Sequence, residues 1–278
     1  LAVHASIPDF VQTFHRYLLK SNYRPTNRHS RWLKKTKQIF NDYSPQKHHY
    51  PNLTEINPYH FLIDFFDYAP SKTTIVCGNG ITIVGTFQCA KIKAAQDLFQ
   101  NVGCASMGYD IPATIGAALG NSKNIICLTG DGSIQLNIQE LALLKSLDRN
   151  IKIFVVNNNG YDSIKQSQKN VFGDDVKLHG VNEASGLHFP GLNKIAAAYD
   201  FDYLKITKDN YNHFNPSVFA ESGDTIIEVY VSNNQSFEPK VGFIKKEDGT
   251  IQSDTLIDMS PKISSQEIQR VLKFLGSD

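Results

Sequence analysis

Two short polar segments have residue types that could together hold a metal ion bound to a phosphate group. Residues 130–133 read Gly-Asp-Gly-Ser, and residues 157–161 read Asn-Asn-Asn-Gly-Tyr. Asp131 and Asn158 carry hard oxygen donors, which Mg²⁺ prefers together with oxygens from a bound phosphate. The two segments therefore predict a site in which one metal ion takes a ligand from each.

The first segment is also suited to a phosphate group. Gly130 and Gly132 lack side chains, so their backbone N–H groups can approach phosphate oxygens closely. Ser133 adds a hydroxyl at the start of the predicted helix that follows, where the helix dipole favours an anion. Together with the metal ligands, these residues predict a site for a metal diphosphate.

The residues between the two segments are expected to form a strand, a helix and a second strand. Residues 124–129 (NIICLT) and 151–156 (IKIFVV) are short apolar runs typical of buried strands, and apolar residues from Ile134 to Leu147 recur with helical spacing. A right-handed crossover makes the two strands parallel, so both polar segments follow carboxyl ends of strands, where open α/β sheets bind ligands.

With these elements between them, the two segments resemble the signature of thiamine-diphosphate-dependent enzymes of the acetolactate synthase and pyruvate decarboxylase type. A Gly-Asp-Gly sequence alone is typical of an ordinary turn, but the paired asparagines at this separation favour the cofactor site. The resemblance implies an α/β fold with a doubly wound, mostly parallel sheet and helices on both faces. It also implies thiamine diphosphate and Mg²⁺ as cofactors.

The resemblance implies roles for individual residues. Asp131 and Asn158 would bind Mg²⁺ through their side chains and Gly160 through its backbone carbonyl, whereas Asn157 would be structural. The residues expected to bind the cofactor are Gly80, Thr82, Ala105, Ser106, Met107, Gly130, Asp131, Gly132, Ser133, Asn158, Gly160 and Tyr161.

Residues 103–113 resemble the family segment in which a bulky apolar side chain lies under the thiazolium ring and bends the cofactor into a V. Met107 holds that position, and its N–H with the carbonyl of Ala105 would bind the aminopyrimidine. The alternative is that Met107 belongs to the core, as methionines commonly do. Its place just before a helix rich in small residues, 112–120, favours the cofactor role.

Two positions depart from the family pattern. Acetolactate synthases carry a Gln-His-Gln-like run where this chain has Ile81-Thr82-Ile83, so two polar diphosphate contacts would be lost. Thr82 could still donate one hydroxyl, and the glycine-rich turn at Gly80 could donate N–H groups. Asp110 replaces a glycine, and its carboxylate is expected to repel a carboxylate substrate nearby. Because of both departures, the resemblance does not identify the substrate.

Composition agrees with a cytoplasmic globular α/β protein. The 278 residues carry a net charge of +1, which does not favour nucleic acid as a partner, and no apolar run is long enough to span a membrane. The four cysteines show no metal-ligand spacing and are expected to be reduced and mainly buried. Cys104, beside the proposed cofactor segment, has a small prospect of a functional role.

Three regions are expected along the chain. Residues 1–20 resemble the last strand and helix of the middle domain in acetolactate-synthase-like proteins, and residues 21–55 form a basic, polar linker. Residues 56–278 form the pyrophosphate-binding domain with a C-terminal tail, which resembles tails in a subgroup associated with bacterial surface-sugar pathways. Within this domain we expect a helix opening at residues 56–59, helices near 163–168 and 192–199, and a strand at 225–231 that closes the sheet.

The resemblance also indicates what the chain would need from elsewhere. In the family a glutamate from an amino-terminal pyrimidine-binding domain, normally of a neighbouring subunit, acts on the aminopyrimidine ring. The resemblance assigns none of residues 1–278 to such a domain, and Glu140 is more simply part of a solvated helix face. We therefore expect that this chain has no catalytic residue and is inactive in isolation. Its expected partner is either a second copy, in a dimer or tetramer, or a different chain that supplies the pyrimidine domain. Whether the full-length protein to which this chain would belong binds FAD is left open.

The implied activity is decarboxylation of a 2-oxo acid, with pyruvate the first choice, followed by transfer of the two-carbon unit to a carbonyl acceptor. The acceptor would be another 2-oxo acid or a keto sugar. One alternative is simple decarboxylation, including by a two-subunit enzyme. Another is a subunit of this fold without catalysis, which the loss of the polar run at 81–83 favours and which the intact Asp131 and Asn158 oppose.

Overall fold

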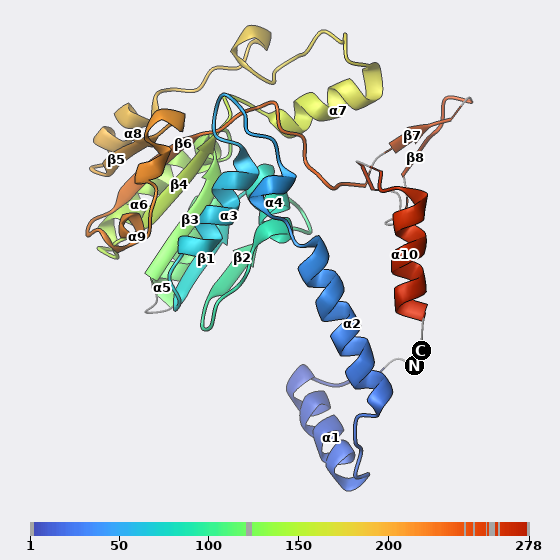
Figure 1. Ribbon diagram of the computed structural model, residues 1–278. Coiled ribbons are helices and arrows are strands. Elements are labelled where there is room, and N and C mark those ends of the chain that lie inside the picture. The colour runs from blue at the N-terminus through green and yellow to red at the C-terminus, as the bar shows by residue number, and fades with distance from the viewer. Residues whose placement is uncertain are drawn as a thin grey trace. The chain divides into compact units, whose positions relative to one another are not determined.

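The computed structural model describes residues 3–120, 124–241, 243–246, 248–253, 255, 259–260 and 262–276. These residues form two compact units. The larger unit is Pro45–Lys262, and the smaller unit combines Leu1–Ser44 with Ile263–Asp278. The relative placement of the units is not determined, so each is described by itself (Figure 1).

A six-stranded parallel sheet is the centre of the larger unit in the described part of the chain. Its strand order is β2-β1-β3-β4-β6-β5. The strands are β1 (Thr73–Cys77), β2 (Asp97–Gln100), β3 (Asn124–Gly130), β4 (Lys152–Asn157), β5 (Asp202–Ile206) and β6 (Thr225–Tyr230). This arrangement confirms the doubly wound α/β fold and the strand-helix-strand unit predicted from the sequence.

Helices cover both faces of the sheet because side chains alternate along its buried strands. On β3, Ile126 and Leu128 pack into one core cluster, whereas Ile125 and Cys127 pack into the other. The first face carries α3 (Pro58–Tyr68), α4 (Ile81–Cys89) and α9 (Ser217–Ala220). The second carries α5 (Asp110–Gly120), η2 (Ile134–Glu140), α6 (Leu141–Ser146) and α8 (Leu192–Ala198).

Two expectations about elements need correction. The strand at 225–231 does not close the sheet, because β6 lies between β4 and β5 and the edge belongs to β5. The segment 134–147 is not one regular helix, because its first part, η2, is a 3₁₀-type stretch that is itself kinked at Asn137 (φ −136°, ψ 42°), and regular α-helix begins only with α6. The helices expected near 163–168 and 192–199 are confirmed by α7 (Asp162–Phe172) and α8.

Shorter elements connect these layers and form the tail. They are η1 (Lys47–His49), η3 (Glu183–Ser185), η4 (Lys208–His213) and an antiparallel pair, β7 (Phe243–Lys245) with β8 (Ile251–Ser253).

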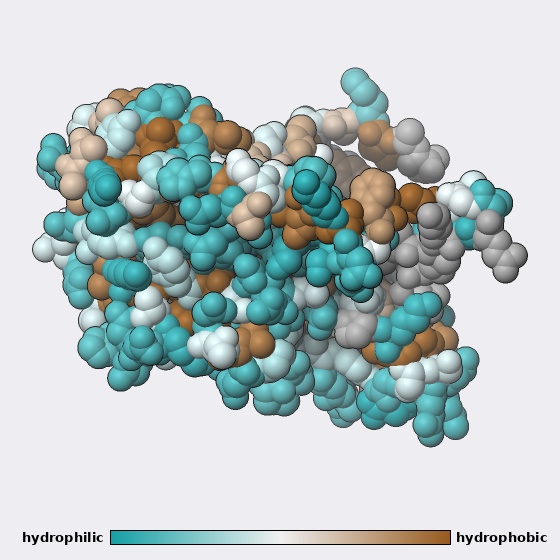
Figure 2. All heavy atoms as spheres, turned by 90° about the horizontal axis from the view of Figure 1, so that it is seen from above, coloured by the Kyte–Doolittle hydropathy of each residue, from teal (hydrophilic) through white to brown (hydrophobic). Residues whose placement is uncertain are grey.

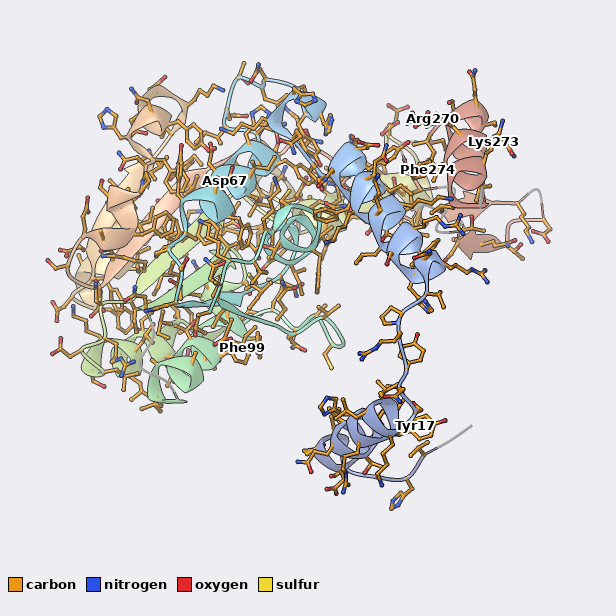
Figure 3. All side chains as sticks on the ribbon, turned by 60° about the horizontal axis from the view of Figure 1, so that its bottom comes forward. Tyr17, Asp67, Phe99, Arg270, Lys273 and Phe274 are labelled. Atoms are coloured by element: carbon orange, nitrogen blue, oxygen red, sulfur yellow. The ribbon has the colours of Figure 1, made fainter. Side chains whose placement is uncertain are left out.

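The smaller unit is helical, with α1 (Ile7–Lys20), α2 (Asn27–Tyr43) and α10 (Ser265–Gly276). The expected helix after residue 6 is present, and residues 3–6 form no strand. A helix also occupies much of the segment expected to be a linker, where the Thr26 N–H donates to His29 Nδ1 at the start of α2. The Lys35 ammonium lies 5.6 Å from the ring centroid of Phe274, a residue that Figure 3 labels on α10.

On the face drawn in Figure 2, most of the coloured residues are hydrophilic, with separate apolar patches among them. No helix among the described residues combines the length and the apolar character needed to cross a membrane. Cys77, Cys89 and Cys127 are buried free thiols and Cys104 is exposed, as expected from the sequence.

Candidate functional site

The two polar segments lie side by side at the carboxyl edge of the sheet. In the register of β3 with β4, Gly130 pairs with Val156, so each strand ends at the same level and the two loops start together. The Asp131 N–H donates to the carbonyl of Val156 at 3.3 Å, which ties the first loop to the second strand. The proximity of the loops predicted from the parallel arrangement is therefore confirmed.

Asp131 is a buried carboxylate in this site, with 5% of its surface exposed. The Gly132 N–H donates to its Oδ1 at 2.8 Å, and the Gly160 N–H donates to its Oδ2 at 3.0 Å. Burial raises the pKa of Asp131 to about 7, although these backbone donors oppose the rise. A nearby cation would offset the cost of burying this charge.

Asn158 provides a second oxygen that lacks a partner within the protein. Its Oδ1 is buried without a hydrogen bond. Buried amide oxygens are nearly always satisfied in folded proteins, so an unpartnered one on a residue that lines the same cavity as Asp131 fits a position that a metal ion would complete. No cluster of three or more His, Cys, Asp or Glu side chains suited to a metal occurs among the described residues. A metal ion bound by Asp131 and Asn158 would thus need further oxygen ligands, which a diphosphate would supply.

Glycine is required at two positions of these loops. Gly160 has φ +148°, and a Cβ there would lie 2.0 Å from the carbonyl oxygen of Val181. A Cβ on Gly132 would lie 2.2 Å from Cε1 of Tyr161. By contrast, a Cβ on Gly130 would meet no atom within 4 Å, so this backbone faces open space that a ligand can enter.

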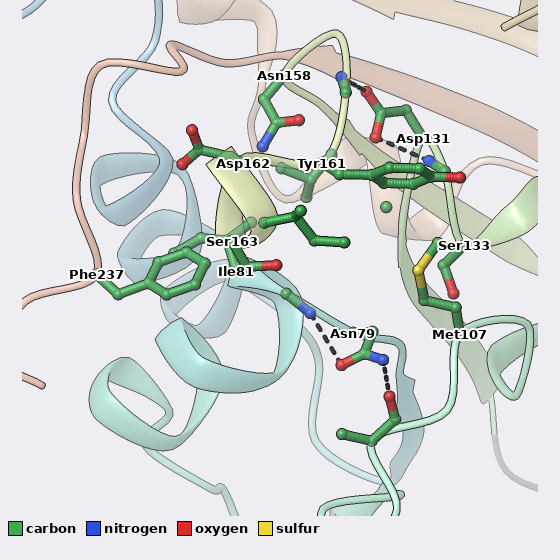
Figure 4. Close-up of a pocket in the computed structure, with 17 residues that line it drawn as sticks. Asn79, Ile81, Met107, Asp131, Ser133, Asn158, Tyr161, Asp162, Ser163 and Phe237 are labelled. Atoms are coloured by element: carbon green, nitrogen blue, oxygen red, sulfur yellow. Dashed lines mark hydrogen bonds between the residues drawn. The ribbon is translucent and has the colours of Figure 1, made fainter. Parts of the chain in front are cut away.

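A cavity of about 310 Å³ opens between these loops (Figure 4). Ten of the twelve residues predicted to bind the cofactor line it: Gly80, Ala105, Met107, Gly130, Asp131, Gly132, Ser133, Asn158, Gly160 and Tyr161. Thr82 does not line it, because it is fully buried and its hydroxyl donates to the Asn79 carbonyl at 2.7 Å. Ser106 is exposed and lies outside the lining as well.

The turn that carries Met107 is fixed to the first loop and to the glycine-rich turn. The Gly108 N–H donates to Ser133 Oγ at 2.9 Å, and the Asn137 amide donates to the Gly108 carbonyl at 2.7 Å. On its other side, the Asn79 amide donates to the carbonyl of Ala105. Met107 is half-buried and faces the cavity, so the structure places it in the site and outside the two core clusters.

The residues that replace the polar Gln-His-Gln-like run form the first turn of α4. Ile81 contributes an apolar side chain to the cavity, and Ile83 is buried. Asn79, which was not predicted from the sequence, is the polar residue that lines the cavity here, and its Oδ1 accepts the Gly80 N–H at 3.1 Å. The sequence signal that could have identified Asn79 was its position directly before Gly80, which was predicted to bind the cofactor.

The expectation that Asp110 would face a substrate does not agree with its position. Asp110 is fully buried at the start of α5, and its carboxylate accepts a hydrogen bond from the Thr129 hydroxyl. It does not line the cavity. Burial raises its pKa, so the carboxyl is held toward its neutral form.

Further residues that were not predicted to bind the cofactor also line the cavity. Ile164 and Phe237 add apolar side chains, Asp162 and Ser163 at the start of α7 add polar ones, and Val156 lies next to Asp131. In Figure 4, Phe237 lies beyond Ile81, across the cavity from Asp131 and Ser133. Phe237 comes from the tail, far in sequence from either loop, so no spacing rule pointed to it.

Other candidate residues from the sequence have structural or surface positions. The Asn157 amide donates to Glu228 Oε1 at 2.6 Å, which agrees with a structural role. His179 is exposed, and His188 is exposed with its Nδ1 4.0 Å from Glu183. Glu140 is half-buried at the end of η2 and does not line the cavity.

Similarity to known proteins agrees with this site. The acetolactate synthase large subunit of Lactococcus lactis is 28% identical over 200 residues, covering 72% of this chain and 33% of that protein. That of Cyanidium caldarium is 32% identical over 142 residues, covering 50% and 23%, and that of Parasynechococcus marenigrum is 28% identical over 195 residues, covering 67% and 30%. The chain thus spans about a third or less of the length of these relatives.

A family described as the thiamine pyrophosphate enzyme C-terminal TPP binding domain matches residues 79–229, more than half of the chain. The match includes both loops, the Met107 turn, four of the six strands of the sheet in full and β6 except for its last residue. This chain therefore belongs to the family of thiamine pyrophosphate enzymes, as their C-terminal, cofactor-binding domain.

Proposed function

We propose that this chain holds the metal and diphosphate of thiamine diphosphate in an enzyme resembling acetolactate synthase. The enzyme would decarboxylate a 2-oxo acid, with pyruvate the first choice, and transfer the two-carbon unit to a carbonyl acceptor such as a second 2-oxo acid or a keto sugar. The observation that carries the proposal is the meeting of the buried Asp131 carboxylate and the unpartnered Asn158 oxygen at one cavity.

Each side of the cavity would have a defined task. Asp131, Asn158 and the Gly160 carbonyl would hold Mg²⁺, while Ser133 and the backbone around Gly130 would bind the diphosphate. Met107 would support the ring part of the cofactor. When bound, thiamine diphosphate supplies the electron sink for decarboxylation, and the protein supplies orientation and exclusion of water.

We further propose that a second domain completes the site. Among the described residues that line the cavity, the carboxylates are Asp131 and Asp162, and no glutamate is present. The glutamate expected from the family would come from a pyrimidine-binding domain of another copy or of a different chain, so the present chain alone would be inactive. FAD in a longer protein that contains this domain stays an open prediction.

Two alternatives make different predictions. A simple decarboxylase would release an aldehyde from pyruvate, whereas a transferase would form a new carbon–carbon bond, so product analysis separates them. A subunit without catalysis is favoured by Ile81, which places an apolar side chain where the family has a polar one. Such a subunit could still bind the cofactor, so the binding experiment must precede any test of activity.

The experiment is isothermal titration of thiamine diphosphate into the chain with Mg²⁺ and with EDTA. We expect binding that needs Mg²⁺ and that Asp131→Ala weakens by at least about 100-fold, or roughly 2.7 kcal/mol. Asp174→Ala is the matched control, because Asp174 is exposed and lies 3.8 Å from Lys169 in a surface ion pair. Binding that survives EDTA, or that Asp131→Ala leaves unchanged, would contradict the proposed metal site.

A further inference from the structure

Asp110 is a buried acidic residue to which the proposed function gives no task. Its side chain is fully buried, and it does not line the cavity that Asp131 lines. Acidic side chains are rarely buried completely unless a specific contact holds them, because burial removes their hydration. One of its carboxyl oxygens, Oδ1, has no hydrogen-bond partner, so the contact that explains its position must involve the other oxygen, Oδ2.

Asp110 Oδ2 lies between two strand ends at the carboxyl edge of the sheet. It accepts a hydrogen bond from the hydroxyl of Thr129, the residue of β3 that comes directly before Gly130. It also lies against Gly78, which follows β1, because a Cβ on Gly78 would collide with this oxygen and would lie 3.3 Å from Cα of Thr129. The Gly78 N–H donates to the carbonyl of Leu128 at 2.7 Å, which joins the two strand ends beside the carboxyl group. The carboxyl group therefore fills a position that β1 and β3 shape together.

The segment 108–110 contacts the loop after β3 at two points. At the first, the Gly108 N–H donates to Ser133 Oγ at 2.9 Å. At the second, the Thr129 hydroxyl donates to the carboxyl group of Asp110. These two hydrogen bonds, here called the brace, lie at opposite ends of the loop. One contact alone would let the segment turn relative to the loop, whereas two contacts fix their relative position.

The brace fixes the position of Met107 relative to the proposed metal site. Met107 comes directly before Gly108, and in Figure 4 it lies beside Ser133 at the cavity. The loop itself is also held from another side, because the Asp131 N–H donates to the Val156 carbonyl at 3.3 Å. Loss of the brace is therefore expected to move the Met107 turn more than it moves Asp131.

We propose that Asp110 is a positioning residue that holds the Met107 turn in place against the metal loop through its hydrogen bond with Thr129. This inference rests on the proposed function, in which Met107 supports the ring part of thiamine diphosphate and Asp131 binds the metal ion. Asp110 touches neither of these groups and acts through Thr129 and the backbone of its own segment. Its task requires an oxygen atom at the place of Oδ2.

Three variants test this role. Thr129→Val removes the hydroxyl at nearly the same size, Asp110→Ala removes the acceptor, and Asp110→Asn keeps an oxygen that can accept the hydrogen bond. Thr225→Val is the matched control, because this buried threonine begins β6 at the opposite edge of the sheet. Its hydroxyl also has a hydrogen bond, from the Lys152 ammonium at 2.9 Å. Far-UV circular dichroism establishes which variants are folded, and Thr129→Val decides the test if Asp110→Ala is unfolded.

The position of Met107 can be followed without any cofactor, because the chain has only two methionines, Met107 and Met259. With ¹³C-labelled methionine methyl groups, NMR gives a resonance for each, and Met107→Leu assigns them. In Thr129→Val and Asp110→Ala, the Met107 resonance should shift by more than its linewidth. In Asp110→Asn and Thr225→Val it should stay in place. A loss of stability alone would not move this resonance in a chain that is still folded.

Titration in the presence of Mg²⁺ then measures whether this position matters to the ligand. In Thr129→Val and Asp110→Ala, thiamine diphosphate binding should weaken about fivefold, the effect of one lost hydrogen bond. Inorganic diphosphate would contact only the metal loop, so its affinity should stay within about twofold. Asp110→Asn and Thr225→Val should bind both ligands within about twofold of the unmodified chain.

A shifted Met107 resonance together with a selective loss of thiamine diphosphate binding in Thr129→Val supports the inference. An unshifted resonance in Thr129→Val, or an Asp110→Asn variant that behaves like Asp110→Ala, would overturn it. Equal loss of both ligands would show that Asp110 shapes the metal loop instead of the Met107 turn, and a shift without any loss of binding would make Asp110 a structural residue only. Both of these results would also overturn the inference. Failure of the unmodified chain to bind thiamine diphosphate would overturn the proposed function together with it.

Discussion

At the scale of single residues, the site contains a carboxylate whose burial costs stability until a cation is present. Asp131 is almost fully buried and has backbone N–H donors but no cationic side chain among its hydrogen-bond partners in the described part of the chain. Two N–H dipoles compensate only part of the lost hydration, which is why its pKa rises. The same feature that prepares the loop for a metal ion therefore makes the metal-free fold sensitive to pH.

The direction of that sensitivity follows from the raised pKa. The folded metal-free chain binds a proton at Asp131 up to about pH 7, whereas the unfolded chain releases it near 3.8. The contribution to stability is therefore fully present below 3.8 and is lost as pH rises through 7. Between about pH 5.5 and 8 the expected loss from this group is about 2 kcal/mol, at about 1.36 kcal/mol per pKa unit.

Urea unfolding of the metal-free chain at both pH values measures this loss. Asp131→Asn cannot titrate, so its change in unfolding free energy should be about 2 kcal/mol smaller than that of the unmodified chain. Identical pH dependence in the two proteins would show that Asp131 is already ionised in the folded state without metal.

Residue types predicted the two loops after β3 and β4 better than the rest of the cavity wall. Asp131 and Asn158 could be selected because oxygen donors that directly follow two parallel strands commonly bind a ligand or a metal ion. Thr82 was selected because it carries the one hydroxyl in the segment that matches the family's polar run, yet that hydroxyl donates to the carbonyl of Asn79. Phe237 could not be selected, because an aromatic residue in a tail carries no sign of its position at the cavity until the chain is folded.

At the scale of elements, the most informative feature is the break in helical geometry inside η2. Asn137 leaves helical geometry there, and its amide holds the carbonyl of Gly108 at 2.7 Å. A Cβ on Gly108 would lie 2.9 Å from that amide nitrogen, so the two backbones are closely packed. The break therefore positions the Met107 turn against the loop that follows β3.

We expect Asn137→Ala to lower the free energy of unfolding by about 1 kcal/mol, since the Gly108 carbonyl loses its donor. Thiamine diphosphate binding should weaken about threefold while its need for Mg²⁺ stays the same. Gln139→Ala is the control, because that exposed side chain makes long hydrogen bonds of 3.3 and 3.5 Å. Thermal unfolding and titration of both variants measure the effects. Equal stability and equal affinity of the two variants would argue against a role for the hydrogen bond from Asn137 to Gly108.

The elements themselves were predictable where their hydrophobic pattern was continuous. β3 and β4 are buried apolar runs and appear as expected, with β4 one residue later. β5 (DYLKI) and β2 (DLFQ) are edge strands whose exposed positions interrupt the pattern, so they were not predicted. The break at Asn137 was also hidden, because the apolar spacing from Ile134 to Leu147 fits one regular helix.

At the scale of the whole molecule, the two units differ in how far they bury their apolar residues. Both core clusters lie between Tyr50 and Val231, inside the larger unit. In the smaller unit no residue of α1, α2 or α10 is fully buried among those described, and Ile7 is 79% exposed. Figure 3 labels Tyr17 on α1, which is 66% exposed. The larger unit therefore carries the stability and the site, whereas the smaller unit offers apolar surface.

This division predicts that residues 45–262 fold and bind cofactor without the rest. We expect their affinity for thiamine diphosphate with Mg²⁺ to stay within about threefold of the full chain, because every residue that lines the cavity lies in this range. Removing the exposed apolar helices should also reduce self-association, measured by light scattering after size-exclusion chromatography. A truncated chain that is unfolded by circular dichroism, or that binds more than about tenfold more weakly, would show that the smaller unit supports the site.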